Sequence, residues 1–211
     1  MMKTILCFGD SNTWGFVPVE RTRYGRSVRW PGLMAQKLGK DYHVIEEGLN
    51  GRTTAFQDYL EPYRNGLDYV APCIMTHAPF DLVIVMLGTN DTKCRYQVSS
   101  GEIANGMKNL IKKLRFYYPT EYYELPKILI AAPAPLRTAP DNISFDAESC
   151  RKIRELPMKY KDIARELGCA FFNAQEVLTE ENLGGDGLHL LPQGHQKLAE
   201  EFTKKVTELL G

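Results

Sequence analysis

The sequence has no apolar run approaching the roughly 20 residues needed to cross a bilayer, and no excess of charge of either sign. Its 26 lysine and arginine residues balance 26 aspartate and glutamate residues. A neutral chain lacks the basic field that attracts nucleic acid or an anionic membrane surface. We therefore expect neither nucleic acid nor a membrane as partner, and expect a small molecule instead.

Cysteine pairs with metal-site or redox spacing are also missing. The five cysteines form an odd set without a Cys-x-x-Cys pair, which argues against a disulfide framework and a structural zinc: Cys7, Cys73, Cys94, Cys150 and Cys169. The Gly-x-Gly-x-x-Gly spacing of dinucleotide-binding turns is absent, so we expect no cofactor and no metal. The amino terminus enters a short apolar run rather than a signal peptide. This favours a cytoplasmic protein, although a signal already removed would leave no trace.

Short apolar, β-rich runs alternate with helical patterns along the chain. The runs cover residues 3–8, 42–46, 81–87, 127–132 and 169–173. This alternation predicts one α/β domain over residues 1–211, in which helices cover both faces of a five-stranded parallel sheet. For this three-layer α/β/α architecture we expect the flavodoxin-like strand order 2-1-3-4-5.

Four segments carry apolar residues at the three- and four-residue spacing of a helix: residues 30–38, 103–114, 153–167 and 198–209. Ser99 and Glu102 predict a capping box before the second. Pro157 is expected to kink the third helix or divide it in two. The stretches 16–29, 133–146 and 173–185 are irregular and long enough to suggest a function.

Polar residues follow the first three strands at the edge of the sheet where ligands bind. Ser11 follows the first strand, Gly51 lies beyond the second and Asn90 beyond the third. In the predicted order these turns are neighbours, with Ser11 in the middle. Its hydroxyl is a candidate nucleophile, and the N–H groups of Ser11 and Gly51 with the Asn90 amide are candidate donors to an oxyanion.

Among the four histidines, His189 is the best candidate for the base that a serine nucleophile requires. Asp186 precedes it by three residues and would accept the Nδ1 proton, leaving Nε2 to face the serine. The other three histidines lack such a partner. We interpret His195 as a surface residue and assign His43 and His77 to structure.

At these positions the chain resembles the SGNH, or GDSL, hydrolase superfamily, and most of all its arylesterase and acyltransferase branch. Four segments carry the resemblance: Gly-Asp-Ser-Asn-Thr-Trp-Gly from residue 9, Val-Ile-Glu-Glu-Gly-Leu-Asn-Gly-Arg-Thr-Thr from residue 44, Met-Leu-Gly-Thr-Asn-Asp-Thr-Lys from residue 86, and Asp-x-x-His at residues 186–189. The resemblance extends over residues 5–210. It implies a catalytic triad of Ser11, Asp186 and His189 and an oxyanion hole of Ser11, Gly51 and Asn90.

Two features depart from the family pattern. Asn12 stands where the common signature has leucine, and we expect it to affect substrate preference. Loop 133–146 does not align with the pattern, and we expect it to influence acyl-group specificity.

Trp14 is a candidate wall of the acyl pocket. Four nearby arginines are expected in a solvated or oligomer-contact loop, and the net charge near zero favours a homo-oligomer: Arg21, Arg23, Arg26 and Arg29.

The predicted function is that of a serine esterase acting on small acetyl or aryl esters through an acyl-enzyme, and the branch resemblance adds acyl transfer to alcohols. Two alternatives stay open. A carbohydrate acetylesterase would use the same machinery and differ only in its loops. A non-catalytic ligand-binding protein would keep the fold without turnover, although the intact Ser11, Asp186 and His189 argue against it.

Overall fold

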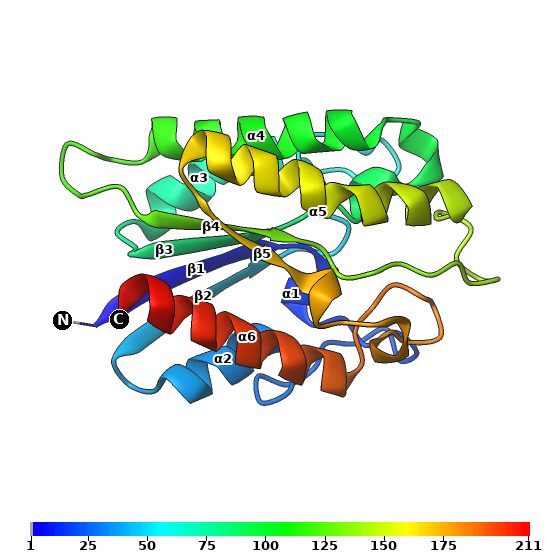
Figure 1. Ribbon diagram of the computed structural model, residues 1–211, viewed down its shortest axis with the longest axis horizontal. Helices are drawn as coiled ribbons and strands as arrows, with labels where there is room; N and C mark the ends of the chain where they lie inside the picture. The colour runs from blue at the N-terminus through cyan, green and yellow to red at the C-terminus, as the bar shows by residue number, and fades with distance from the viewer. Residues whose placement is uncertain (1) are drawn as a thin grey trace.

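The computed structural model describes residues 2–211, which form a three-layer α/β/α arrangement around a parallel sheet (Figure 1). Its strands are β1 (Lys3–Gly9), β2 (Tyr42–Gly48), β3 (Leu82–Met86), β4 (Lys127–Ala132) and β5 (Ala170–Asn173). Every neighbouring pair is parallel, in the order β2-β1-β3-β4-β5. The predicted fold class and strand order are confirmed.

The helices divide between the two faces of the sheet (Figure 1). One face is covered by α3 (Gly66–His77), α4 (Ser100–Tyr117) and α5 (Ala147–Leu167), and the other by α2 (Trp30–Leu38) and α6 (Pro192–Leu210). The short helix α1 (Ser11–Trp14) follows β1 directly. It therefore begins at the carboxyl edge of the sheet, where the predicted site residues lie.

Side chains of the central strands alternate between the two helical layers. In β1, Leu6 and Phe8 pack with α3 and α4, whereas Ile5 and Cys7 pack with α2 and α6. All five residues of β3 are buried. Burial on both faces explains the nearly continuous apolar sequence of this strand.

Helix α3 occupies a position that the strand–helix alternation requires but that no sequence pattern located. It begins after Asn65, whose side chain accepts the N–H of Leu67 at 3.0 Å, and it contains Pro72. Before α4, Ser99 accepts the N–H of Glu102 at 3.1 Å. Within residues 2–211 the reciprocal bond from Glu102 is not formed, so the predicted capping box is half present.

Pro157 does not divide α5, which runs unbroken from Ala147 to Leu167. A proline in a helix leaves the carbonyl four residues earlier without its N–H partner. Here that carbonyl belongs to Ile153, and it accepts a hydrogen bond of 2.9 Å from the Gln175 side-chain amide. A residue distant in sequence thus replaces the lost helical bond.

His195 is completely buried in α6, so its interpretation as a surface residue is wrong. Its Nδ1 accepts the N–H of Trp30 at the start of α2, at 3.3 Å. It shares a helix face with Leu198 and Phe202, a spacing visible in the sequence. Burial, with smaller effects of the charges on His189 and Arg29, lowers the pKa of His195 to about 3. The ring is therefore neutral in the folded protein at physiological pH.

The buried neutral His195 is expected to make folding sensitive to acid. Below its ordinary pKa of 6.5 the unfolded chain binds a proton that the folded chain does not, so stability falls as the pH falls. From pH 7 to pH 5 the wild type should lose about 2 kcal/mol more unfolding free energy than His195→Gln. Urea titrations at several pH values measure this, with the exposed His43→Gln as control. Equal pH slopes for the wild type and His195→Gln would contradict the assignment.

Candidate active site

Ser11, His189 and Asp186 lie in hydrogen-bond contact at the carboxyl edge of the sheet. His189 Nε2 is 2.9 Å from Ser11 Oγ, and His189 Nδ1 is 2.6 Å from Asp186 Oδ2. Ser11 is the first residue of α1, and its helix is capped by Asp10, whose carboxylate accepts the N–H of Asn12 at 3.0 Å. The structure thus brings together the three residues that the sequence selected.

The turn that carries His189 is closed by Asp186 itself. Asp186 Oδ1 accepts the backbone N–H groups of Leu188 and His189, each at 3.0 Å, while Oδ2 faces the imidazole. Burial alone would raise the pKa of Asp186. The hydrogen bond and charge of His189, together with the two backbone N–H groups, outweigh burial and lower the pKa. The carboxylate therefore stays ionised beside the ring, oriented on both of its oxygens.

Asn12 stands where the family signature has leucine. Its side chain connects α1 to the backbone of the two residues that flank His189. Its amide Nδ2 donates to the Leu188 carbonyl at 3.2 Å, and its Oδ1 accepts the N–H of Leu190 at 3.0 Å. Only 3% of Asn12 is exposed. A residue next to Ser11 thus holds the backbone that presents the imidazole to Ser11.

Loop 133–146 supports the same turn from the other side. The Arg137 N–H donates to the Gly187 carbonyl at 2.9 Å, and the Asn142 amide donates to the Asp186 carbonyl at 3.2 Å. Gly187 has φ +70°, and a Cβ there would lie 2.1 Å from the Arg137 carbonyl oxygen. Only glycine fits this close approach of two backbones.

The candidate oxyanion donors come from three adjacent turns, as predicted. Within residues 2–211, the backbone N–H groups of Ser11 and Gly51 donate to no protein acceptor, which leaves both available to a ligand. The Asn90 amide donates one of its N–H groups to the Arg52 carbonyl at 3.1 Å. A side-chain amide has two such hydrogens, so a second donor remains.

Asp91 joins the turn after β3 to the loop after β2. It is fully buried, and its carboxylate accepts the Thr54 N–H at 2.9 Å and the Thr54 hydroxyl. Burial raises the pKa of Asp91 to about 7, against the opposing effect of these hydrogen bonds. Asn90 and Asp91 together therefore attach one turn to the segment immediately after Gly51.

A cleft of about 840 Å³ opens over His189. This volume lies in the range of small-ligand sites. Phe16 forms one wall, with its ring centroid 4.3 Å from that of the His189 ring. Trp14, the sequence candidate for the pocket, does not line this cleft and packs instead against the Arg23 guanidinium, 5.1 Å from its ring centroid. The cleft is lined by Phe16, Pro18, Val19, Arg21, Glu61, Asp141, Asn142, Gly185, Asp186, Leu188 and His189.

The four arginines of loop 16–29 do not form a uniformly solvated patch. Arg23 and Arg26 lie 3.3 and 3.4 Å from the Glu46 carboxylate, and Arg29 also pairs with it. Glu46 in β2 therefore has three cationic partners, which attach this loop to the sheet. Of the four arginines, only Arg21 lines the cleft.

Within residues 2–211, three ligand atoms that one metal ion could reach belong to Glu47, Cys73 and His77. His77 Nε2 lies 2.8 Å from one Glu47 oxygen, and the Arg52 guanidinium lies 3.8 Å from the other. That guanidinium would repel a cation, and burial raises the pKa of the Cys73 thiol to about 12, which disfavours a thiolate ligand. The cluster is better explained as support for Arg52, which donates to the Gly9 carbonyl at 3.0 Å.

Across residues 2–211, the structure contains no helix with both the length and the apolar character of a membrane span.

The fold and the site together define a parallel α/β protein in which a serine, a histidine and an aspartate meet at the carboxyl edge of the sheet. The family model for GDSL-like lipases and acylhydrolases matches residues 7–197. The chain belongs to this family, which confirms the resemblance and the expected enzyme class, a carboxylic ester hydrolase.

Solved structures of similar proteins cover essentially the whole chain. An aryl esterase of M. smegmatis is 40% identical with a TM-score of 0.93, covering 99% of this chain and 100% of that one. A carbohydrate acetylesterase from Sinorhizobium meliloti is 39% identical, with the same TM-score and coverage. A curated acetylxylan esterase from Xylanibacter ruminicola is 26% identical over 93% of this chain. This chain spans only 41% of the length of that relative.

Replacing Asn12 by leucine, the residue of the family signature, is expected to loosen the His189 turn. The Leu188 carbonyl and the Leu190 N–H would lose their partners while buried, which should lower the free energy of unfolding by about 2 kcal/mol or more. A less firmly held imidazole should lower kcat by about tenfold. Urea unfolding and ester hydrolysis measure the two effects, with the exposed Asn105→Leu as matched control. Unchanged stability and kcat in Asn12→Leu would refute this role.

Proposed function

We propose that this chain is a serine esterase that hydrolyses small acyl esters through a covalent acyl-enzyme. One observation carries the proposal: the Ser11 hydroxyl lies 2.9 Å from His189 Nε2, while Asp186 occupies the other ring nitrogen. A neutral imidazole held in this way can accept the serine proton, and the carboxylate stabilises the imidazolium that forms. Membership in the GDSL-like family supports the same chemistry.

The proposed reaction has two halves. Ser11 Oγ attacks the ester carbonyl carbon as its proton passes to His189 Nε2, which gives a tetrahedral intermediate with a negative oxygen. The bond to the alcohol then breaks, and Nε2 returns the proton to the departing oxygen. Water repeats the sequence on the acyl-enzyme, with His189 as base, and releases the acid and the free serine. An alcohol that takes the place of water would receive the acyl group, which is the expected transfer reaction.

In this proposal, three N–H groups donate hydrogen bonds to the negative oxygen of the intermediate. They are the backbone N–H groups of Ser11 and Gly51 and the free N–H of the Asn90 amide. The first two have no protein acceptor within the described residues, and the third is oriented through its other hydrogen by the Arg52 carbonyl. Donors already oriented in a partly buried site stabilise charge more than water does, because they need no reorganisation. No metal or other cofactor takes part in this scheme.

The substrate class follows from the cleft and from the relatives. Phe16, Pro18 and Val19 offer an apolar wall to an acyl or aryl group, whereas Glu61, Asp141 and other polar groups line the remainder. Relatives named as an aryl esterase and as a carbohydrate acetylesterase have nearly equal identity to this chain. We favour small acetyl or aryl esters, and the polar part of the lining keeps acetylated sugars as the second candidate.

A homo-oligomer forms part of the proposal. The tip of the loop between β2 and α3 exposes three large apolar side chains next to the cleft: Tyr59 at 91%, Leu60 at 74% and Tyr63 at 86%. The chain carries no net charge to oppose association. Light scattering that gave the mass of a single chain at micromolar concentration would contradict this part.

Replacement of Ser11 by alanine should abolish the acyl-enzyme. With p-nitrophenyl acetate, stopped-flow absorbance should record a burst of p-nitrophenol for the wild type and none for Ser11→Ala. Asn90→Ala should keep the nucleophile but lose about 2.7 to 4 kcal/mol of transition-state stabilisation, as for other oxyanion donors. The exposed Asn105→Ala is the matched control. A full burst in Ser11→Ala, or unchanged kcat/KM in Asn90→Ala, contradicts the assigned role.

The two candidate substrates are separated by comparing kcat/KM for phenyl acetate with that for acetylated xylose and glucose. If aryl acetates are the better class, the ratio should exceed about tenfold, because one apolar group placed in a matching pocket contributes 1–3 kcal/mol. A ratio in favour of the sugar acetates would select the carbohydrate acetylesterase. Tight binding of either ester without any turnover would instead select the non-catalytic alternative.

A further inference from the structure

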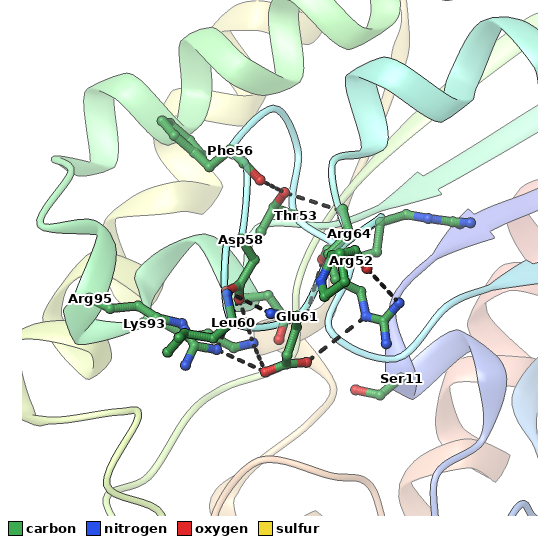
Figure 2. A network of polar contacts seen from close by, with 12 residues as sticks. Ser11, Arg52, Thr53, Phe56, Asp58, Leu60, Glu61, Arg64, Lys93 and Arg95 are labelled. Atoms are coloured by element: carbon green, nitrogen blue, oxygen red, sulfur yellow. Dashed lines mark hydrogen bonds and ion pairs between the residues drawn. The ribbon is translucent and has the colours of Figure 1, made fainter.

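The loop that follows Gly51 is closed by hydrogen bonds between its two ends before α3 begins (Figure 2). The Thr53 N–H donates to the Arg64 carbonyl at 2.9 Å, which joins the two ends of the loop. Inside it, Asp58 Oδ1 accepts the backbone N–H of Glu61 at 3.2 Å. These bonds set the backbone around residue 61, so the direction of the Glu61 side chain is determined locally.

Four charged side chains then connect this loop to the segment after β3 (Figure 2). Lys93 Nζ lies 3.1 Å from Glu61 Oε1 and 3.6 Å from Asp58 Oδ2, and Arg95 Nη2 lies 2.8 and 2.9 Å from the same two atoms. Asp58 and Lys93 are 1% and 5% exposed. Burial would raise the pKa of Glu61, but its bonds and charge interactions with Lys93 and Arg95 lower that pKa. The cluster therefore contains ionised groups of alternating sign.

The other oxygen of the same carboxylate lies against Gly51. A Cβ built on Gly51 would be 2.7 Å from Glu61 Oε2 and 3.2 Å from Arg64 Nε, so these two groups occupy the space of a side chain at position 51. Gly51 has φ +79°, a left-handed conformation that favours glycine. Lys93, which holds the opposite oxygen, comes three residues after Asn90. One carboxylate thus touches the residue that carries one candidate oxyanion donor and is anchored next to another.

We propose that Glu61 is a positioning residue of the oxyanion hole: held by Lys93 and Arg95, its carboxylate rests on Gly51 and sets the place of the Gly51 N–H relative to the Asn90 amide. This inference rests on the proposed function. Glu61 also lines the cleft, where its side chain is 41% exposed. Its effect is on the geometry of the donors, which matters when charge develops on the substrate oxygen.

The contact predicts that residues 51 and 61 compensate for each other. Gly51→Ala should push the Glu61 carboxylate away and lower kcat by about tenfold, with KM nearly unchanged. Glu61→Asp, shorter by one methylene, should cost about threefold on its own. The double variant Gly51→Ala/Glu61→Asp makes room for the added methyl group but keeps the strain of alanine at φ +79°. Its loss in kcat should therefore be clearly smaller than the product of the two single losses, without a return to the wild-type value. Inhibition by a phenylboronic acid, which forms a tetrahedral adduct on serine, should follow kcat across the series.

A matched control is Glu166→Asp, whose carboxylate pairs with Lys108 on α4 and lies far from the cleft along α5. It should keep wild-type kcat, and thermal melting should give the same midpoint for all five proteins within a few degrees. A double variant whose loss is the product of the two single losses, or boronate affinity that does not change with kcat, would overturn the proposal. Absence of a p-nitrophenol burst in the wild type would instead overturn the proposed function, so the two failures are distinguishable.

Discussion

A serine hydroxyl and an imidazole 178 residues apart in the chain lie 2.9 Å from each other, and every proposed step depends on that contact. No covalent link keeps them together. Ser11 is placed by the end of β1 and the cap of α1, whereas His189 is placed by a turn beyond β5 at the border of the sheet. Parallel strands direct both segments to one edge of the sheet. Contacts within the loops must then bring the two side chains to hydrogen-bond distance.

The loops supply that precision through backbone hydrogen bonds rather than through apolar packing. Asn12 joins the two sides of His189 to α1, Asp186 closes the turn, and Asn142 supports it from loop 133–146. On the other side of Ser11, a different set of polar contacts connects the turns after β2 and β3. The nucleophile thus lies between two polar frameworks, one that holds the base and one that holds the donors for developing charge.

Much of this was predictable because the strongest sequence signals are periodic or local. The alternation of apolar runs with helical patterns predicted a parallel sheet, for which the common doubly wound strand order was expected. The polar turns after three strands and the Asp-x-x-His spacing selected Ser11, Asp186 and His189. Long-range partners were not predictable from local patterns. Gln175 supports the helix across Pro157, and Trp30 gives the buried His195 its partner. The cluster around Glu61 requires two loops that no sequence pattern placed side by side.

The most direct test of the central claim is to identify the residue that reacts with an organophosphonate ester. Such a reagent should attach one phosphonyl group per chain, and peptide mass spectrometry should locate it on Ser11. The rate should fall at least a hundredfold in His189→Ala, because the hydroxyl then has no base. Label on another residue, or an active esterase that takes up no label, would contradict the account.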